Sequence, residues 1–409
     1  MGVLEDVDGS TPPQGLVGHY KKLLKAGELS PEGNENLESP TDSEPDLSDA
    51  AIKDRLESTR AALNRIVKEY LGDSEELREV AEQIVKEGGE ALRVLRGEDD
   101  AGLAARGGLL DGLEAIVRTD GSRPSFMVRN AAVDLASSPA GNWENPITVS
   151  ADLLAGAVEC VGRIDVPGSE QGFEGTGFLV HENLIITNRH VLQVAADWQE
   201  DRTYKVKQGA AIDFGHEFRA RRTVNRRALR RVVYCGRSPI VQNNLDHKKL
   251  DLALIELEPA DDNTRPSMAL SVELAQEWAQ PGATVYAVGY PADPGPAAPL
   301  SLLETLFRMT YGHKRLAPGL LMSSQQSVHT WTLAHDATTL GGNSGSVILV
   351  RGREHTAAGL HYGGRWGQPR ENWGHVLASV LDEPGLGSDK TLREHFVEFG
   401  VSMVDSFNF

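Results

Sequence analysis

The chain has 409 residues, more than one ordinary domain needs, which suggests two or three domains. Its 41 basic and 59 acidic residues leave a net charge of −18, which argues against a dedicated nucleic-acid binder or a polybasic membrane anchor. No apolar run approaches the roughly 20 residues of a membrane-spanning helix. The N-terminus lacks the basic-then-apolar pattern of a signal peptide, and the two cysteines form no disulfide framework. We therefore predict a cytoplasmic protein.

The N-terminal third is predicted to be helical behind an acidic tail. Residues 1–49 are rich in Gly, Pro and acidic residues, so we expect a largely flexible region with one short amphipathic helix near residues 16–24. Residues 50–120 carry apolar side chains at helical spacing and predict a small helical bundle of three or four helices. Gly88-Gly89 is expected to interrupt the second of them.

Residues 121–156 are predicted to be a connector between the bundle and the rest of the chain. Gly121 and Pro124 bracket a segment that we expect to be flexible. Such junctions are favoured sites of proteolytic nicking, and Arg123 and Arg129 are candidate cleavage points.

The region after the connector has the pattern of an antiparallel β-protein. Short runs rich in Val, Ile, Leu, Tyr and Phe alternate with Gly, Pro, Asn and Asp from about residue 157 onward. Repeated short strands separated by turn residues indicate a barrel or a sandwich. A final helix is expected at about residues 390–399.

Three short sequences in this β-rich part contain the residues of a nucleophilic site. His190 follows an apolar strand, Asp251 opens another, and Ser344 lies within Gly-Gly-Asn-Ser-Gly-Ser. A serine hydroxyl is a poor nucleophile until an imidazole accepts its proton, and a buried carboxylate must hold that imidazole in the right tautomer. The glycines allow a turn in which the amides of Gly342 and Ser344 form an oxyanion hole. The sequence therefore predicts a serine-protease site.

Residues 157–385 resemble the trypsin-like peptidases, through Gly175-Thr-Gly-Phe-Leu-Val and the three motifs above. The resemblance implies His190 as general base, Asp251 as orienting carboxylate and Ser344 as nucleophile. It also implies a multidomain α and β protein, in which the helical bundle precedes a chymotrypsin-like double antiparallel β-barrel with a C-terminal helix, over residues 157–409. Asn343 stands where digestive zymogens have an aspartate, so activation by a freed N-terminus is not expected.

The specificity pocket is expected beside the nucleophile. Thr338 stands where trypsin-like enzymes that cut after Lys or Arg have an aspartate, and a buried unpaired arginine would cost several kcal/mol. Thr339 and His361 resemble the pair with which bacterial glutamyl endopeptidases bind the P1 side chain, which implies cleavage after Glu, then Gln or Asp. The alternative is that His361 only packs within the barrel. Tyr362 and Gly363 are expected to pair with an extended substrate.

Other polar residues are assigned lesser roles. Asp246 is a weaker candidate than Asp251 because no apolar strand follows to bury it, and Asp336 is expected to shape the loop before the nucleophile. The arginine-rich run at residues 219–231 favours a solvated hairpin over a nucleic-acid site, since aromatic residues are sparse there. No metal or cofactor is expected, because the remaining histidines lack metal-site spacing, namely His329, His335, His355 and His375.

The expected function is that of a cytosolic serine endopeptidase acting on a protein or peptide, with no nucleic acid and no membrane. Bacterial proteases of this kind often carry an N-terminal adaptor domain. By that analogy the helical bundle would recruit or regulate the enzyme through a protein partner, and the substrate would be a pore-forming or other effector protein in antiviral defence. The alternatives are a catalytically silent binding scaffold with a protease fold and a general quality-control protease.

Overall fold

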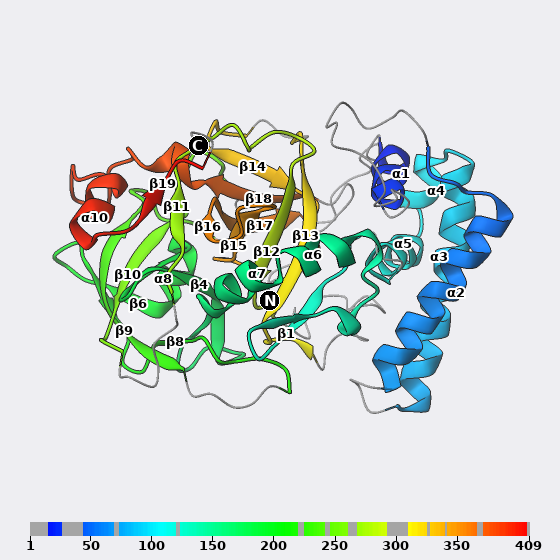
Figure 1. The fold of residues 1–409 in the computed structure, drawn as a ribbon, viewed down its shortest axis with the longest axis horizontal. Coiled ribbons are helices and arrows are strands. Elements are labelled where there is room, and N and C mark those ends of the chain that lie inside the picture. Colours follow the sequence, from blue (N-terminus) through cyan, green and yellow to red (C-terminus); the bar gives the residue numbers. More distant parts are fainter. Residues whose placement is uncertain are drawn as a thin grey trace, which may run out of the picture.

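The computed structural model describes residues 15–26, 44–68, 73–119, 123–219, 225–241, 246–260, 268–292, 310–324, 328–339, 342–365 and 371–406. Residues 1–14 and 27–43 of the predicted flexible tail lie outside these ranges, whereas residues 44–49 are described and Leu47 is buried in the core of the bundle. A helical bundle occupies one end of the molecule and a β-rich body the other (Figure 1). None of the described helices is long and apolar enough to cross a membrane.

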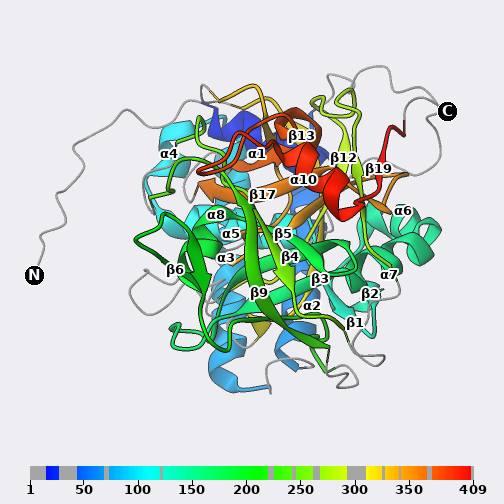
Figure 2. The ribbon, with the colours of Figure 1, turned by 90° about the vertical axis from the view of Figure 1, so that its left-hand side faces the viewer.

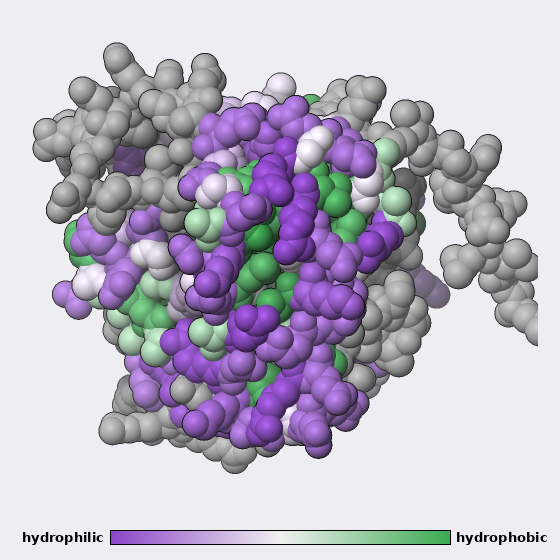
Figure 3. Space-filling model, turned by 90° about the vertical axis from the view of Figure 1, so that its right-hand side faces the viewer, coloured by the Kyte–Doolittle hydropathy of each residue, from purple (hydrophilic) through white to green (hydrophobic). Residues whose placement is uncertain are grey.

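The bundle consists of helices whose apolar faces meet in shared clusters. Its described helices are α1 (Leu16–Ala26), α2 (Asp49–Ile66), α3 (Glu75–Arg96), α4 (Asp100–Ala104) and α5 (Gly107–Thr119). The short helix expected near residues 16–24 is α1, and its Leu16 and Tyr20 are buried in one cluster with Leu113 of α5. The helix is therefore a packed part of the bundle. The outward face of the bundle is mainly hydrophilic (Figure 3).

The prediction of a break at Gly88-Gly89 is wrong, because α3 runs through both residues without interruption. The reason lies in the packing of α3 against α5. A Cβ on Gly88 would lie 2.8 Å from Ile116 Cδ1, and one on Gly112 would lie 2.3 Å from the Gly88 nitrogen. These glycines let the two helix backbones approach closely, so they mark a helix contact and not a helix end.

The connector is integrated into the protein body. It contains β1 (Phe126–Arg129), β2 (Ala132–Asp134), α6 (Glu144–Val149) and α7 (Ala151–Glu159). Strand β1 pairs antiparallel with β13 of the β-rich body, with Phe126 opposite Leu316. Arg123 is only 2% exposed. The expectation that Arg123 lies in a flexible, cleavable segment is therefore wrong, since a protease cannot reach a buried residue.

The first barrel is a closed ring of antiparallel strands (Figure 2). In ring order its strands are β10 (Ala253–Leu257), β5 (Leu184–Thr187), β4 (Phe173–His181), β3 (Val161–Asp165), β8 (Ala211–Asp213) and β9 (Arg226–Cys235). Outside the ring, α8 (Arg189–Ala195) follows β5 and leads into the paired strands β6 (Ala196–Trp198) and β7 (Tyr204–Val206). Apolar residues such as Ile186 and Leu254 fill its interior.

The second barrel closes in the same way, because β12 pairs with both β15 and β13. In ring order its strands are β12 (Thr284–Gly289), β15 (Val347–Val350), β17 (Gly359–Arg365), β18 (Glu371–Val376), β14 (Thr332–His335) and β13 (Arg315–Met322). A small parallel sheet contains β11 (Ser271–Glu273), β16 (Thr356–Ala357) and β19 (Met403–Val404), and α10 (Leu392–Phe399) lies near the C-terminal end. The predicted fold class, helices followed by a chymotrypsin-like double barrel and a C-terminal helix, is confirmed.

The arginine-rich run is only partly a solvated hairpin. Arg230 and Arg231 on β9 are exposed and pair with Glu256 at 2.9 and 2.5 Å. Arg227 is 3% exposed and donates to the backbone oxygens of Glu182 and Glu258, each at 2.7 Å. The buried arginine thus replaces missing backbone hydrogen bonds at the strand ends, a role that the charge run by itself does not indicate.

Candidate active site

Strand pairing in the first barrel brings His190 and Asp251 into contact. Strands β5 and β10 are antiparallel, with Thr187 opposite Ala253, so His190, just after β5, lies beside Asp251, just before β10. The His190 Nδ1 atom lies 2.6 Å from Asp251 Oδ2, and the His190 amide donates to Asp251 Oδ1 at 2.9 Å. Two contacts to one carboxylate fix both the position and the orientation of the imidazole.

The same carboxylate sets the protonation of the pair. Burial alone would lower the pKa of His190, but the charge of Asp251, its hydrogen bond, and the charge of Glu174 leave that pKa above the usual 6.5. Burial would raise the pKa of Asp251, and His190 opposes this so that the pKa stays below 3.8. Asp251 is thus an anion that stabilises the imidazolium. The weaker candidate, Asp246, is exposed and accepts from the Lys248 amide at 3.1 Å.

A second histidine contacts Asp251 from another side. The Asp251 amide donates to His375 Nε2 at 3.0 Å. Burial lowers the pKa of His375 to about 4, despite the opposing charge of Asp251, so the imidazole is neutral and can accept this bond. No local motif around His375 indicates the contact, because it depends on the position of β18 beside the end of the first barrel.

Ser344 lies in a tight loop that is bound to the first barrel. Gly342 and Gly345 have φ values of +85° and +89°, which favour glycine, so the loop needs both residues. The Thr176 amide on β4 donates to the Ser344 carbonyl oxygen at 2.8 Å. A Cβ on Gly175 would lie 2.8 Å from that oxygen and 2.7 Å from Val191, the residue after His190. The serine loop and the histidine helix therefore meet at Gly175.

The two expected oxyanion donors are uncommitted within the described residues. Neither the Gly342 amide nor the Ser344 amide donates to a protein acceptor there. The Gly342 carbonyl is held by the Thr176 hydroxyl at 3.3 Å, and that hydroxyl also accepts from the Tyr290 amide at 3.0 Å. Thr176, to which the sequence analysis assigned no role, thus braces Gly342, the residue whose amide is an expected oxyanion donor.

The expected pocket residues separate into two groups. Thr339 is 5% exposed and donates to Asn372 Oδ1 at 2.6 Å, while His361 is 3% exposed on β17 beside the serine loop. The Gly345 amide donates to the His361 carbonyl at 2.9 Å, which fixes this strand against the loop. The hydroxyl of Thr338, in contrast, donates to the Arg123 carbonyl at 2.7 Å, toward the connector.

His361 is joined to a second buried histidine. His335 Nε2 lies 3.2 Å from His361 Nδ1. Burial, followed by the charges of His335 and His190, lowers the pKa of His361 well below 6.5, so His361 is neutral. Within the described residues no protein group binds its Nε2 atom. The two histidines are distant in sequence and share no motif, so their pairing was not predicted. No described residues form a cluster of three or more metal-ligand side chains.

Tyr362 and Gly363 lie at a bulge in β17, where the pairing with β18 shifts between His361 and Gly363. The Tyr362 hydroxyl lies 2.7 Å from His247 Nδ1, and its side chain is buried with Trp373. Strand β15 pairs with β17 only at residues 359 and 360 in the described chain. On the side that faces β15, the backbone edge from Tyr362 onward is therefore unpaired there, whereas the Tyr362 side chain is buried against Ala334 and Trp373.

Comparison of the sequence with a family model and with a curated relative points to one family. The family model for the trypsin-like peptidase domain matches residues 175–355. A probable serine protease of Lysobacter enzymogenes is 30% identical over 279 residues, which cover 62% of this chain and 70% of that protein. Among solved structures, the Rv3671c protease of M. tuberculosis in an inactive form is 14% identical, with 62% of this chain and 96% of that chain covered and a TM-score of 0.34. Human heparin binding protein is 16% identical, with 56% and 94% covered and a TM-score of 0.38.

Proposed function

The chain belongs to the trypsin-like peptidase family and is a serine endopeptidase, and we propose that His190, Asp251 and Ser344 form its catalytic triad. The observation that supports this most directly is the 2.6 Å contact of His190 with Asp251, beside a serine loop that is hydrogen-bonded to the same barrel. The amides of Gly342 and Ser344 are the proposed oxyanion donors.

In the proposed mechanism, His190 Nε2 accepts the hydroxyl proton as Ser344 Oγ attacks the scissile carbonyl carbon. The carbonyl π electrons move to oxygen, where the two amides stabilise the negative charge. The oxygen re-forms the double bond, the C–N bond breaks, and His190 gives its proton to the leaving amine. A water molecule then repeats the addition on the acyl-enzyme and releases the acid. Asp251 stays ionised throughout and stabilises the imidazolium.

The test is covalent labelling. A fluorophosphonate should modify Ser344, and Ser344→Ala should lose both the label and peptide hydrolysis while remaining folded, because only a hydroxyl is removed. This experiment also tests the alternative of a catalytically silent scaffold. Peptide hydrolysis at the normal rate by folded Ser344→Ala protein would rule out the triad.

We further propose that the enzyme cleaves after a residue with a side-chain carbonyl, Glu first and then Gln or Asp. The support is a neutral His361 that is linked to Thr339 through His335 and Asn372. His335 can donate to His361 Nδ1 and thereby leave an N–H at Nε2 for the substrate. Tyr362 and Gly363 would contribute their backbone edge to the extended substrate. A pocket of this kind rejects apolar analogues by roughly 10⁴–10⁵-fold. Preferred cleavage after Arg or Lys in a peptide library would contradict the assignment.

The cellular setting is proposed on separate grounds. Cys160 and Cys235 are both buried free thiols, and burial raises the pKa of Cys160 to about 12, which suits a reducing, cytoplasmic compartment. Recruitment through the helical bundle, and a pore-forming or other effector of antiviral defence as substrate, stay predictions from domain organisation. Proteomic comparison of cells containing the wild-type enzyme or Ser344→Ala would identify the substrate directly.

A further inference from the structure

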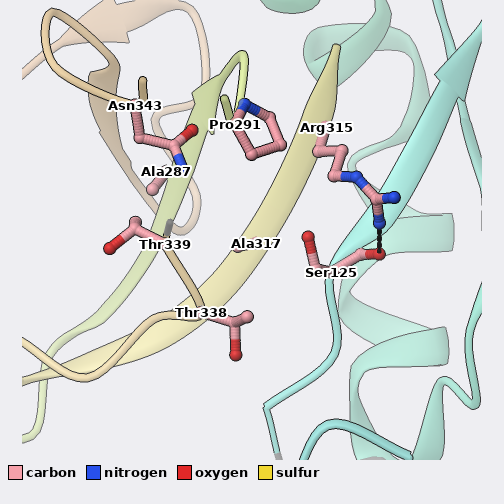
Figure 4. Close-up of a pocket in the computed structure, with 8 residues that line it drawn as sticks. All are labelled: Ser125, Ala287, Pro291, Arg315, Ala317, Thr338, Thr339 and Asn343. Atoms are coloured by element: carbon pink, nitrogen blue, oxygen red, sulfur yellow. Dashed lines mark hydrogen bonds between the residues drawn. The ribbon is translucent and has the colours of Figure 1, made fainter. Parts of the chain in front are cut away.

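Residues Arg123–Val128, here called the strap, lie between the helical bundle and the second barrel. The Val128 amide donates to the Lys314 carbonyl at 3.0 Å, and Arg315 donates to the Ser125 carbonyl at 3.2 Å (Figure 4). The strap is thus attached along β13. Strand β13 pairs with β14, which leads into residues 335–339, here called the pocket segment because they include Thr339.

The first residue of the strap forms a buried ion pair with that pocket segment. Arg123 Nε and Nη2 each lie 2.7 Å from an Asp336 carboxylate oxygen, although the residues are 213 positions apart in sequence. The two side chains are 2% and 12% exposed. Asp336 also accepts from the Leu320 amide at 2.7 Å. Charged groups this deeply buried have a strong preference for one geometry, because loss of either partner leaves an unpaired charge.

The strap touches the outer side of the segment whose inner side forms the pocket. The Thr338 hydroxyl donates to the Arg123 carbonyl at 2.7 Å, whereas the next residue, Thr339, donates to Asn372 at 2.6 Å. Ser125 of the strap lines one small cavity together with Thr338, Thr339 and Asn343, the residue before Ser344 (Figure 4). A movement of Arg123 would therefore change the positions of Thr339 and of the residue that precedes Ser344.

The strap is also held by the bundle. The Arg123 amide donates to the Val117 carbonyl on α5 at 2.7 Å. Met127 is buried in one cluster with Leu63 of α2 and Ile84 of α3. The strap therefore has the bundle on one side and the pocket segment on the other.

We propose that Arg123 is a positioning residue, through which the helical bundle holds the 335–339 segment in the arrangement that forms the specificity pocket. The anion that fixes this loop is Asp336, and its cation comes from within the chain, so no freed N-terminus is needed. The proposal rests on the proposed pocket function of this loop. Through the contact of Arg123 with Asp336, a change in the bundle alters the shape of the pocket and thereby the choice of substrate.

The experiment compares full-length Arg123→Gln, Asp336→Asn and the double variant with Arg129→Gln. Arg129 is the matched control, because it ends β1, directly after the strap, and pairs at 3.0 Å with Asp134 of the connector. The double variant leaves no buried charge unpaired, which guards against simple misfolding. Active sites are titrated with fluorophosphonate, and kcat and KM are measured for peptides that differ only at P1.

Misplacement of pocket groups should lower kcat/KM by on the order of 10–100-fold, chiefly through KM, and should reduce P1 selectivity. Arg123→Lys, which keeps the charge but not the two-pronged contact, should recover part of the affinity, and Arg129→Gln should match wild type. A loss of stability alone would leave KM and P1 selectivity of the titrated enzyme unchanged, and that result would overturn the proposal.

A second readout does not require activity. In full-length Ser344→Ala protein, Arg123→Gln should accelerate amide hydrogen exchange in peptides covering residues 335–346, but not in β4 or β5 of the first barrel. Unchanged exchange at 335–346 overturns the proposed link even if activity changes. If the wild-type enzyme hydrolyses no peptide, the proposed function fails by itself, and the exchange measurement still decides on the strap.

Discussion

Thr176 and Ser344 are joined by a 2.8 Å hydrogen bond from the amide of the first to the carbonyl oxygen of the second. The bond connects β4 of the first barrel to the nucleophile loop of the second. His190 and Asp251 belong to the first barrel, so the position of Ser344 relative to its proposed partners His190 and Asp251 depends on this junction. The Thr176 hydroxyl reinforces the junction through the Gly342 carbonyl and the Tyr290 amide.

Thr176→Val should lower both stability and turnover. The substitution keeps the shape of the side chain but leaves the buried Tyr290 amide without an acceptor, which should cost about 1–3 kcal/mol in the free energy of unfolding. Because the Gly342 peptide also loses its support, kcat should fall. Urea unfolding and steady-state kinetics measure the two effects. Thr176→Ser retains the hydroxyl and should resemble wild type; equal impairment of both variants would contradict this role.

Asp251→Asn should reduce kcat by on the order of 10⁴, because an amide favours the wrong tautomer of His190 and cannot stabilise its cation. Steady-state kinetics on a peptide, after titration of folded enzyme, measure the loss. Asp246→Asn is the matched control, since Asp246 is exposed and away from His190. A larger loss for Asp246→Asn than for Asp251→Asn would show that Asp246, and not Asp251, is the carboxylate that orients His190.

The acidic limb of the pH profile should report His190. Below its pKa the imidazole is protonated and cannot accept the Ser344 proton, so kcat/KM should fall as pH decreases through that value, which lies above 6.5. Half-buried Glu174 contributes to the raised pKa of His190 through its negative charge. Glu174→Gln should therefore move the limb to lower pH, while Glu200→Gln, at an exposed site, should not. A limb that stays in place or rises in Glu174→Gln would refute the coupling.

Gly112→Ala should destabilise the helical bundle. The added Cβ would lie 2.3 Å from the Gly88 nitrogen, so α5 must move away from α3, at about 1–3 kcal/mol. Gly18→Ala on α1 meets no atom within 4 Å and should be neutral or stabilising by up to about 1 kcal/mol. Urea unfolding followed by helical circular dichroism compares the two. Equal stability of both variants would contradict the close α3–α5 contact.

Local sequence patterns were enough to predict helices followed by antiparallel strands, and they pointed to His190 and Asp251, which the structure brings into contact. Those inferences succeeded because they depend on local patterns. Apolar periodicity follows from the geometry of one helix or strand, and each motif joins a polar residue to the end of a strand. Antiparallel pairing then places neighbouring strand ends together.

The contacts of residues without such a pattern became apparent only in the folded protein. Gly88 resembles a helix break until Gly112 is placed against it, and Arg123 resembles part of a linker until Asp336 is found 213 residues away. The pairing of His335 with His361 likewise depends on the closing of the second barrel. The physical reason is the same in each case. The free energy of a buried glycine, ion pair or histidine is set by its neighbours in space, and a local sequence pattern does not contain them.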